Sequence, residues 1–273
     1  MPTRCIIDNS KEKEYVCQSS FANNTFKVVK CKQCGLLYID AEDKKLEKIL
    51  HGYYQGEYQK KYHSKKEFFK TFREKISRFL TIYYSQADSQ IEFLKKNSIL
   101  PGQTILDLGC GFGTFIVWLE KKGYLANGIE PDNQRAEKAK KYLKKGKITI
   151  GEIETAKFSN ANAVTMLHVL EHLQNPIETL KEIKRKNPSS KILIEVPNCE
   201  TKEVLELSTK EPHIYHFTPE TIKKTIEKAG WRIIDTELAD DRTSFWQQLK
   251  WLFFRKNVYK KSKNKRAIRI LAE

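Results

Sequence analysis

The stretch Ile105-Leu-Asp-Leu-Gly-Cys-Gly-Phe-Gly113 decides the fold, and a helical pattern follows it from about Thr114. An apolar run predicts a buried strand, and the alternate glycines after it let the backbone turn sharply and approach a ligand closely. Many nucleotide-binding proteins have glycine-rich turns, so the loop alone is a weak signal. Its G-x-G-x-G spacing differs from the dinucleotide G-x-G-x-x-G, and no Walker lysine follows. An NAD site and a phosphate cradle are therefore disfavoured.

Two acidic residues accompany the glycine loop. Asp107 precedes Gly109 by two positions, and Glu130 ends the next predicted strand, 21 residues after that glycine. A carboxylate at the end of the second strand can accept hydrogen bonds from both hydroxyls of a ribose. The two acids therefore favour a nucleoside-containing ligand over an incidental acidic pair in a generic α/β fold.

Short β-rich runs alternate with helical segments on both sides of the loop, which is typical of a doubly wound parallel sheet. The predicted strands are Thr104–Leu108, Leu125–Glu130, Ile148–Ile153, Ala163–Leu167, Ile192–Val196 and Trp231–Leu238. The alternating run Ala267–Leu271 predicts a last, antiparallel strand. We therefore expect an α/β fold with a doubly wound, seven-stranded Rossmann-like sheet.

The composition limits the cellular setting. Fifty basic against 34 acidic residues give a net charge of +16, which would suit a nucleic-acid or anionic-membrane partner. Lysine is spread along the whole chain and no compact RNA-binding motif is present, so background composition is the preferred explanation. No apolar run approaches the roughly 20 residues of a membrane span. The first residues lack a secretory pattern, and six cysteines are too few for a disulfide scaffold. We expect a cytoplasmic protein.

The ordered motifs of residues 101–240 resemble those of the class I S-adenosylmethionine-dependent methyltransferases. After the D-L-G-C-G-x-G loop come the acidic strand end at Glu130 and Gly151-Glu-Ile-Glu154. Leu167-His-Val-Leu-Glu-His-Leu173 resembles the family's L-E-H-L segment, and His213-Ile-Tyr-His-Phe-Thr-Pro-Glu-Thr221 resembles its H-L-Y-H-F-T-P-E-T segment. One departure is Asn160-Ala-Asn162, where the family has Phe-Asp, at a peripheral position.

The resemblance implies S-adenosylmethionine as cofactor and assigns residues to it. The loop would line the methionine and ribose portion, Asp107 would hold the loop or the ammonium group, and Glu130 would bind the ribose hydroxyls. Glu152 and Ile153 would flank the adenine, and Leu167 and His168 would lie near the methyl group. The implied cofactor-binding set is Asp107, Gly109, Cys110, Gly111, Gly113, Glu130, Glu152, Ile153 and Leu167. The Cys110 and Cys199 side chains are expected to pack in the interior.

Four of the six histidines fall in two short segments that follow predicted strands. A histidine changes charge near neutral pH, and ligands of open α/β sheets bind at the carboxyl ends of the strands. His168 and His213 are the first candidates for a catalytic base, followed by His216. His172 would instead cap or brace a helix. Methyl transfer can also proceed by placement alone, without a dedicated base.

The N-terminal cysteines suggest a metal site. Cys31-Lys-Gln-Cys34-Gly35 has zinc-knuckle spacing, and Cys5-Ile-Ile-Asp8 repeats the spacing with an aspartate as its second ligand. Cys17 is the alternative fourth ligand. The expected group is one structural zinc, and a metal-free remnant of a zinc ribbon is the alternative.

The chain divides into three predicted parts: a zinc-ribbon-like lobe (1–40), a helical lead-in or lid (41–100) and a catalytic domain (101–273). Lead-in tyrosines would either cover the cofactor or pack, namely Tyr53, Tyr54, Tyr58 and Tyr62. A basic, aromatic helix is predicted near 244–256, with an apolar face of Phe245, Trp246, Leu249, Leu252 and Phe253. Core packing or dimerisation is preferred for that face over peripheral contact with a membrane.

The function implied is methyl transfer to an oxygen or nitrogen of a small polar acceptor. By resemblance, the acceptor would be a sugar, a nucleotide-linked sugar or a phosphate or phosphoramidate group of surface-polysaccharide or natural-product biosynthesis. The alternatives are a tRNA or rRNA methyltransferase and a non-catalytic cofactor-binding scaffold. A nucleic-acid partner is disfavoured because no RNA module is present, and a monomer or homodimer is expected.

Overall fold

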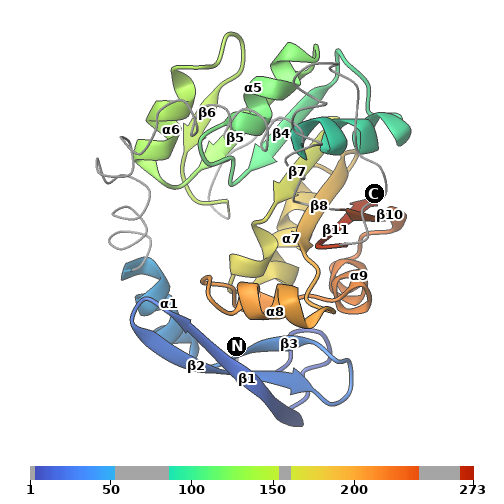
Figure 1. Ribbon diagram of the computed structural model, residues 1–273. Helices are drawn as coiled ribbons and strands as arrows, with labels where there is room; N and C mark the ends of the chain where they lie inside the picture. The colour runs from blue at the N-terminus through green and yellow to red at the C-terminus, as the bar shows by residue number, and fades with distance from the viewer. Residues whose placement is uncertain (1–3, 53–85, 154–160, 240–264) are drawn as a thin grey trace.

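The computed structural model describes residues 4–52, 86–153, 161–239 and 265–273, and within them two β-sheets are formed (Figure 1). The larger sheet has seven strands in the order β10-β11-β8-β7-β4-β5-β6. The smaller sheet has four strands in the order β1-β2-β3-β9. The predicted lead-in tyrosines and the predicted helix near 244–256 lie outside the described residues.

The seven-stranded sheet confirms the predicted α/β fold. Its strands are β4 (Thr104–Leu108), β5 (Leu125–Glu130), β6 (Ile148–Ile150), β7 (Ala163–Leu167), β8 (Lys191–Pro197), β10 (Ile233–Ala239) and β11 (Ala267–Ala272). The five strands β4 to β8 are parallel, whereas β11 runs antiparallel between β8 and β10. Strand order reverses beside β4, because β5 follows on one side and β7 on the other. Ligands of open α/β sheets bind at such a reversal.

Two strand ends differ from the prediction by more than one residue. Strand β6 ends at Ile150 rather than Ile153, although the Gly151 amide still donates to the carbonyl of Glu130 (3.2 Å). Strand β10 begins at Ile233 rather than Trp231. The Trp231 side chain is buried and its indole N–H donates to the carbonyl of Leu180 (3.0 Å). An apolar side chain can thus belong to the core without belonging to a strand.

Helices connect the strands and bury one face each. They are α1 (Asp43–Gly52), α5 (Thr114–Lys121), α6 (Asn133–Lys140), α7 (Pro176–Lys186), α8 (Lys202–Ser208) and α9 (Pro219–Lys228), with a further helical run over 86–96 and a 3-10 turn, η2 (Leu170–His172). Their starts follow capping rules: Asp132 accepts from the Arg135 amide before α6, and Thr218 forms a capping box with Thr221 at α9. No described helix is long and apolar enough to cross a bilayer.

The N-terminal strands are joined to the C-terminal half of the chain. Strands β1 (Lys13–Phe21), β2 (Asn24–Cys31) and β3 (Leu37–Asp40) form an antiparallel meander. Strand β9 (Tyr215–His216) comes from far along the chain and pairs with β3. In Figure 1 this sheet lies beside α8.

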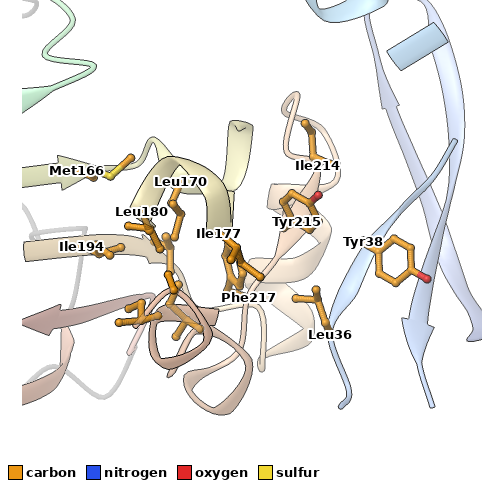
Figure 2. Packing of buried hydrophobic residues seen from close by; sticks show 14 of the residues in the cluster. Leu36, Tyr38, Met166, Leu170, Ile177, Leu180, Ile194, Ile214, Tyr215 and Phe217 are labelled. Atoms are coloured by element: carbon orange, nitrogen blue, oxygen red, sulfur yellow. The ribbon is translucent and has the colours of Figure 1, made fainter. Parts of the chain in front are cut away.

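One hydrophobic core extends from the large sheet to the N-terminal strands. Figure 2 shows Met166 and Ile194 on the large sheet, then Tyr215 and Phe217, and finally Leu36 beside β3. All five side chains are buried in the same cluster. The N-terminal strands therefore share their core with the segment that carries His213 and His216.

Candidate active site

The three loop glycines have positive φ angles of 70°, 56° and 69° at Gly109, Gly111 and Gly113. Their surroundings differ. A Cβ on Gly109 would lie 2.6 Å from a methyl carbon of Val169, and one on Gly113 would lie 2.8 Å from the Ala139 Cβ. A Cβ on Gly111 would meet nothing within 4 Å. Two of the glycines are thus explained by packing within the protein, and Gly111 is the one that faces open space.

Glu130 lies against this loop. Its carboxylate accepts hydrogen bonds from the amides of Gly111 (2.7 Å) and Asp132 (3.0 Å). Burial raises the pKa of Glu130 to about 7, although these two hydrogen bonds oppose the shift. Each carboxylate oxygen has a second lone pair, so the group can still accept hydrogen bonds from a ligand.

Asp107 is buried beneath the loop and accepts a hydrogen bond from the Thr165 hydroxyl (2.6 Å), which ties β4 to β7. Burial raises the pKa of Asp107 to about 7; the Thr165 hydrogen bond opposes this shift, and the Glu130 charge adds to it.

The other predicted cofactor residues differ in exposure. Leu167 is partly buried, Ile153 is buried and Glu152 is exposed. Cys110 packs in the interior, as Cys199 does.

His168 follows β7 with a positive φ of 56°. Its amide donates to the carbonyl of Glu195 (2.8 Å), which holds this backbone at the end of β8. The ring Nε2 lies 3.2 Å from Glu195 Oε1 and Nδ1 lies 3.5 Å from Glu171 Oε1. Burial disfavours the charged ring, but the two carboxylates outweigh burial and raise the pKa of His168 to about 10. In this arrangement the ring is a cation at neutral pH.

A buried ion pair of Glu195 and Arg269 lies next to the His168 ring. Glu195 and Arg269 are both fully buried, and the Arg269 guanidinium donates to Glu195 Oε2 and to the Ser89 hydroxyl (2.6 Å). The side-chain amides of Gln86 and Gln90 donate to Glu195 Oε1 at 3.1 and 3.0 Å. This cluster was not predicted from the sequence. The available signal was a charged residue inside each of two otherwise apolar strands.

His213 and His216 are buried and share one partner, since the Ser208 hydroxyl lies 2.7 Å from Nδ1 of His213 and 2.8 Å from Nδ1 of His216. Burial lowers the pKa of His216 to about 4. Burial also lowers the pKa of His213, together with the charges of the neighbouring histidines. Both rings are therefore neutral at pH 7. His172 donates from Nδ1 to the carbonyl of Pro212 (3.1 Å), which ties the η2 turn to the segment before β9.

A family model described as a methyltransferase domain matches residues 66–236, which is more than half of the chain. The chain belongs to this methyltransferase family. The match includes the glycine loop, Glu130 and both histidine segments. Together with the fold, it establishes an S-adenosylmethionine-dependent methyltransferase.

Curated relatives of the methyltransferase are distant. Ubiquinone biosynthesis O-methyltransferase of Coxiella burnetii (strain RSA 493) is 23% identical over 165 residues, covering 54% of this chain and 70% of the relative. The protein of the same name from Hahella chejuensis is 24% identical over 168 residues, covering 56% and 71%.

Solved structures show the same fold. Magnesium protoporphyrin IX methyltransferase of Synechocystis PCC 6803 with bound SAH has a TM-score of 0.57 at 15% identity, covering 83% of this chain and 98% of the other. An S-adenosylmethionine-dependent methyltransferase of Clostridium acetobutylicum has a TM-score of 0.51 at 14% identity, covering 74% and 96%.

The N-terminal cysteines of the methyltransferase converge on one point. Cys5 Sγ lies 3.3 Å from Cys34 Sγ, and Cys31 Sγ lies 3.3 Å from an Asp8 oxygen. The ligand atoms of these four residues all lie within 4.8 Å of one another, a group that fits a tetrahedral ion. Cys17 lies outside this group. Of the two predicted fourth ligands, the geometry therefore favours Asp8.

Proposed function

We propose that the enzyme transfers a methyl group from S-adenosylmethionine to an oxygen of a small polar acceptor. The observation that carries the proposal is the glycine loop at the strand-order reversal, with open space at Gly111 and a buried carboxylate, Glu130, bonded to that residue's amide. The curated relatives are named O-methyltransferases, which supports oxygen as the acceptor atom. A sugar or nucleotide-linked sugar remains our predicted acceptor class, on family resemblance alone.

In this proposal the cofactor and the acceptor bind at the ends of different strands. When bound, S-adenosylmethionine supplies a methyl group already activated on a sulfonium. Glu130 would hold the ribose and the loop around Gly111 would lie along the rest of the cofactor, while Leu167 and His168 flank the acceptor. The acceptor oxygen gains the methyl group as the carbon–sulfur bond breaks, the electron pair stays on sulfur, and the acceptor proton leaves. The protein's main contribution is to place the two reactants and exclude water.

The three predicted base candidates are now distinguished by their charge and exposure. His168 is one-third exposed and positively charged, which suits it to orient an acceptor but not to take its proton. His213 is neutral and 7% exposed, whereas His216 is fully buried behind Ser208. We propose that His168 and His213 face the acceptor side and that His216 braces the segment.

The direct test is formation of S-adenosylhomocysteine. We expect the purified enzyme to bind S-adenosylmethionine by calorimetry and to release its demethylated product with some member of a panel of phenols, sugars and nucleotide-linked sugars. Labelled methyl groups on oxygen, identified by NMR of the product, would support the proposal. Binding without turnover across the whole panel, or methylation of added tRNA only, would contradict it.

Cofactor affinity should depend on pH through Glu130. Burial raises the pKa of this carboxyl to about 7, and only its ionised form accepts hydrogen bonds from the ribose at both oxygens. Affinity should therefore be constant above about pH 7 and fall by up to about tenfold for each unit below it. Glu130→Gln should weaken binding by about tenfold or more at pH 8 and reduce the pH dependence.

Calorimetry between pH 5.5 and 8.5 checks this expectation. Asp107 has a similarly raised pKa, so Asp107→Asn is the matched control. The control should retain the pH dependence that Glu130→Gln loses. If Glu130→Gln binds with wild-type affinity and the wild-type pH profile, the carboxylate does not hold the ribose.

We also propose one structural zinc on Cys5, Asp8, Cys31 and Cys34. Elemental analysis of Cys34→Ser should show about one zinc per chain less than the wild type, because the site loses one of its four ligands. Cys17→Ser is the matched control and should keep the full zinc content. Equal zinc in wild type and Cys34→Ser, in protein prepared without chelator, would remove the proposal.

A further inference from the structure

A second group of metal-type ligands lies beside the proposed acceptor position and is separate from the cysteine group. Glu171 and His172 belong to the η2 turn after β7, and His213 precedes β9. Their ligand atoms all lie within 4.8 Å of one another. The Ile214 amide donates to the Glu171 carbonyl (2.9 Å), which fixes the two segments relative to each other.

The two imidazoles are oriented as metal ligands are. His172 Nδ1 donates to the carbonyl of Pro212, so the lone pair of a neutral ring is on Nε2. The Ser208 hydroxyl lies 2.7 Å from Nδ1 of His213 and can accept a hydrogen bond from the Nδ1–H, which leaves the lone pair on Nε2, 4.0 Å from Glu171 Oε1. A ligating histidine almost always donates its other ring N–H to a fixed acceptor in this way, which sets its tautomer and orientation.

The Glu171 carboxylate provides the second, independent observation. It is 1% exposed, and within the described residues neither of its oxygens has a hydrogen-bond partner. A buried carboxylate without hydrogen bonds is costly unless a cation compensates it. The His168 ring lies 3.5 Å away and contributes charge, but it is shared with Glu195.

We propose that Glu171, His172 and His213 bind a first-row divalent cation such as Zn²⁺, with a coordination position left for an acceptor oxygen. Two imidazole nitrogens and one carboxylate suit Zn²⁺ and its neighbours better than Mg²⁺. Three protein ligands are the usual number where zinc keeps an open position.

The η2 turn that carries Glu171 and His172 is connected to the cofactor loop through the residue that precedes it. Val169, between His168 and the η2 turn, occupies the space that a side chain on Gly109 would need. A cation here could therefore bind the acceptor hydroxyl close to the transferable methyl group and lower its pKa, so that the proton is lost to solvent before methyl transfer. His213 would then act as a ligand rather than as the base. This catalytic role rests on the proposed function, whereas metal binding does not.

The test is metal binding by the full chain without any acceptor. Chelator-treated protein is titrated with Co²⁺ and followed by absorption, since a cysteine-bound ion gives a thiolate charge-transfer band and an ion on nitrogen and oxygen gives ligand-field bands alone. We expect a class of binding without the thiolate band. Glu171→Gln and His172→Gln should each abolish that class and leave the thiolate band unchanged.

Two further variants keep the test decisive. Ser208→Ala removes the partner of His213 but no ligand, and it should weaken Co²⁺ binding at this site by about 10- to 100-fold. His168→Gln is the matched control in the same loop and should keep the site. Retained S-adenosylmethionine binding shows that each variant is folded.

The outcomes separate the two proposals. A thiolate-bound ion only, or unchanged Co²⁺ binding in Glu171→Gln and His172→Gln, overturns the metal site and leaves the His168 cation as the partner of Glu171. Metal binding in a protein that methylates no oxygen acceptor would support the site and contradict the proposed function.

Discussion

Gly111→Asp should abolish cofactor binding while the chain stays folded. The affinity for S-adenosylmethionine is expected to fall at least about 100-fold, which corresponds to about 3 kcal/mol. A side chain at this position meets no protein atom within 4 Å, so it would project into the space proposed for the cofactor. The φ of 56° is a conformation that aspartate adopts at small cost, so the fold should lose only about 1 kcal/mol.

Gly102→Asp is the matched control for this variant. Gly102 also has a positive φ, 91°, and nothing within 4 Å of a built Cβ, but it precedes β4 at the opposite end of that strand. The control should carry at least as much backbone strain, because 91° lies beyond the left-handed range, and still bind S-adenosylmethionine normally. Calorimetry and thermal unfolding of both variants make the comparison. Wild-type affinity in a folded Gly111→Asp protein would refute the assignment of the loop.

Arg269→Met should lower the free energy of unfolding by about 3–5 kcal/mol. The guanidinium is fully buried and is the main positive partner of Glu195, which is also fully buried. Removal of one member of a buried pair leaves an uncompensated charge in a low-dielectric interior. The Arg269 charge also holds the pKa of Glu195 well below its usual range, despite the opposing effect of burial.

Urea unfolding of the full chain measures this effect. Arg185→Met is the matched control, because Arg185 pairs with Glu182 at the surface, where solvent screens the charges and such pairs add little to stability. The double variant Arg269→Met, Glu195→Gln should recover part of the loss, since the unpaired charge is gone. If Arg269→Met and Arg185→Met are equally stable, the buried pair does not support the sheet as proposed.

The sequence determined the sheet because its signals are local. A mostly apolar run of five or six residues specifies a buried strand, and a glycine directly after it specifies a sharp turn. The ranges Thr104–Leu108, Leu125–Glu130 and Ala163–Leu167 match the observed strands at both ends. The antiparallel strand at Ala267 was also predicted, from an apparent alternation, although all six of its residues are buried.

The roles of the loop glycines and of the candidate histidines depend on their neighbours in the folded chain. The three loop glycines look equivalent in the sequence, but Val169 and Ala139 explain two of them and only Gly111 faces open space. The candidate histidines also look equivalent, but carboxylates make His168 a cation while burial keeps His213 and His216 neutral. These differences arise from neighbouring side chains that are distant in the sequence. The spacing of residues within a motif therefore does not predict them.

The fold class, the methyltransferase resemblance and the C-x-x-C and C-x-x-D spacings could be recognised in the sequence. The pairing of β9 with β3, the position of Asp8 rather than Cys17 beside the other three cysteines, and the contact of Arg269 with Glu195 became visible in the folded chain. The physical reason is the range of the interactions. Hydrophobic periodicity and glycine turns act within a few residues, whereas charge compensation and ligand convergence depend on which distant segments the folded chain brings together.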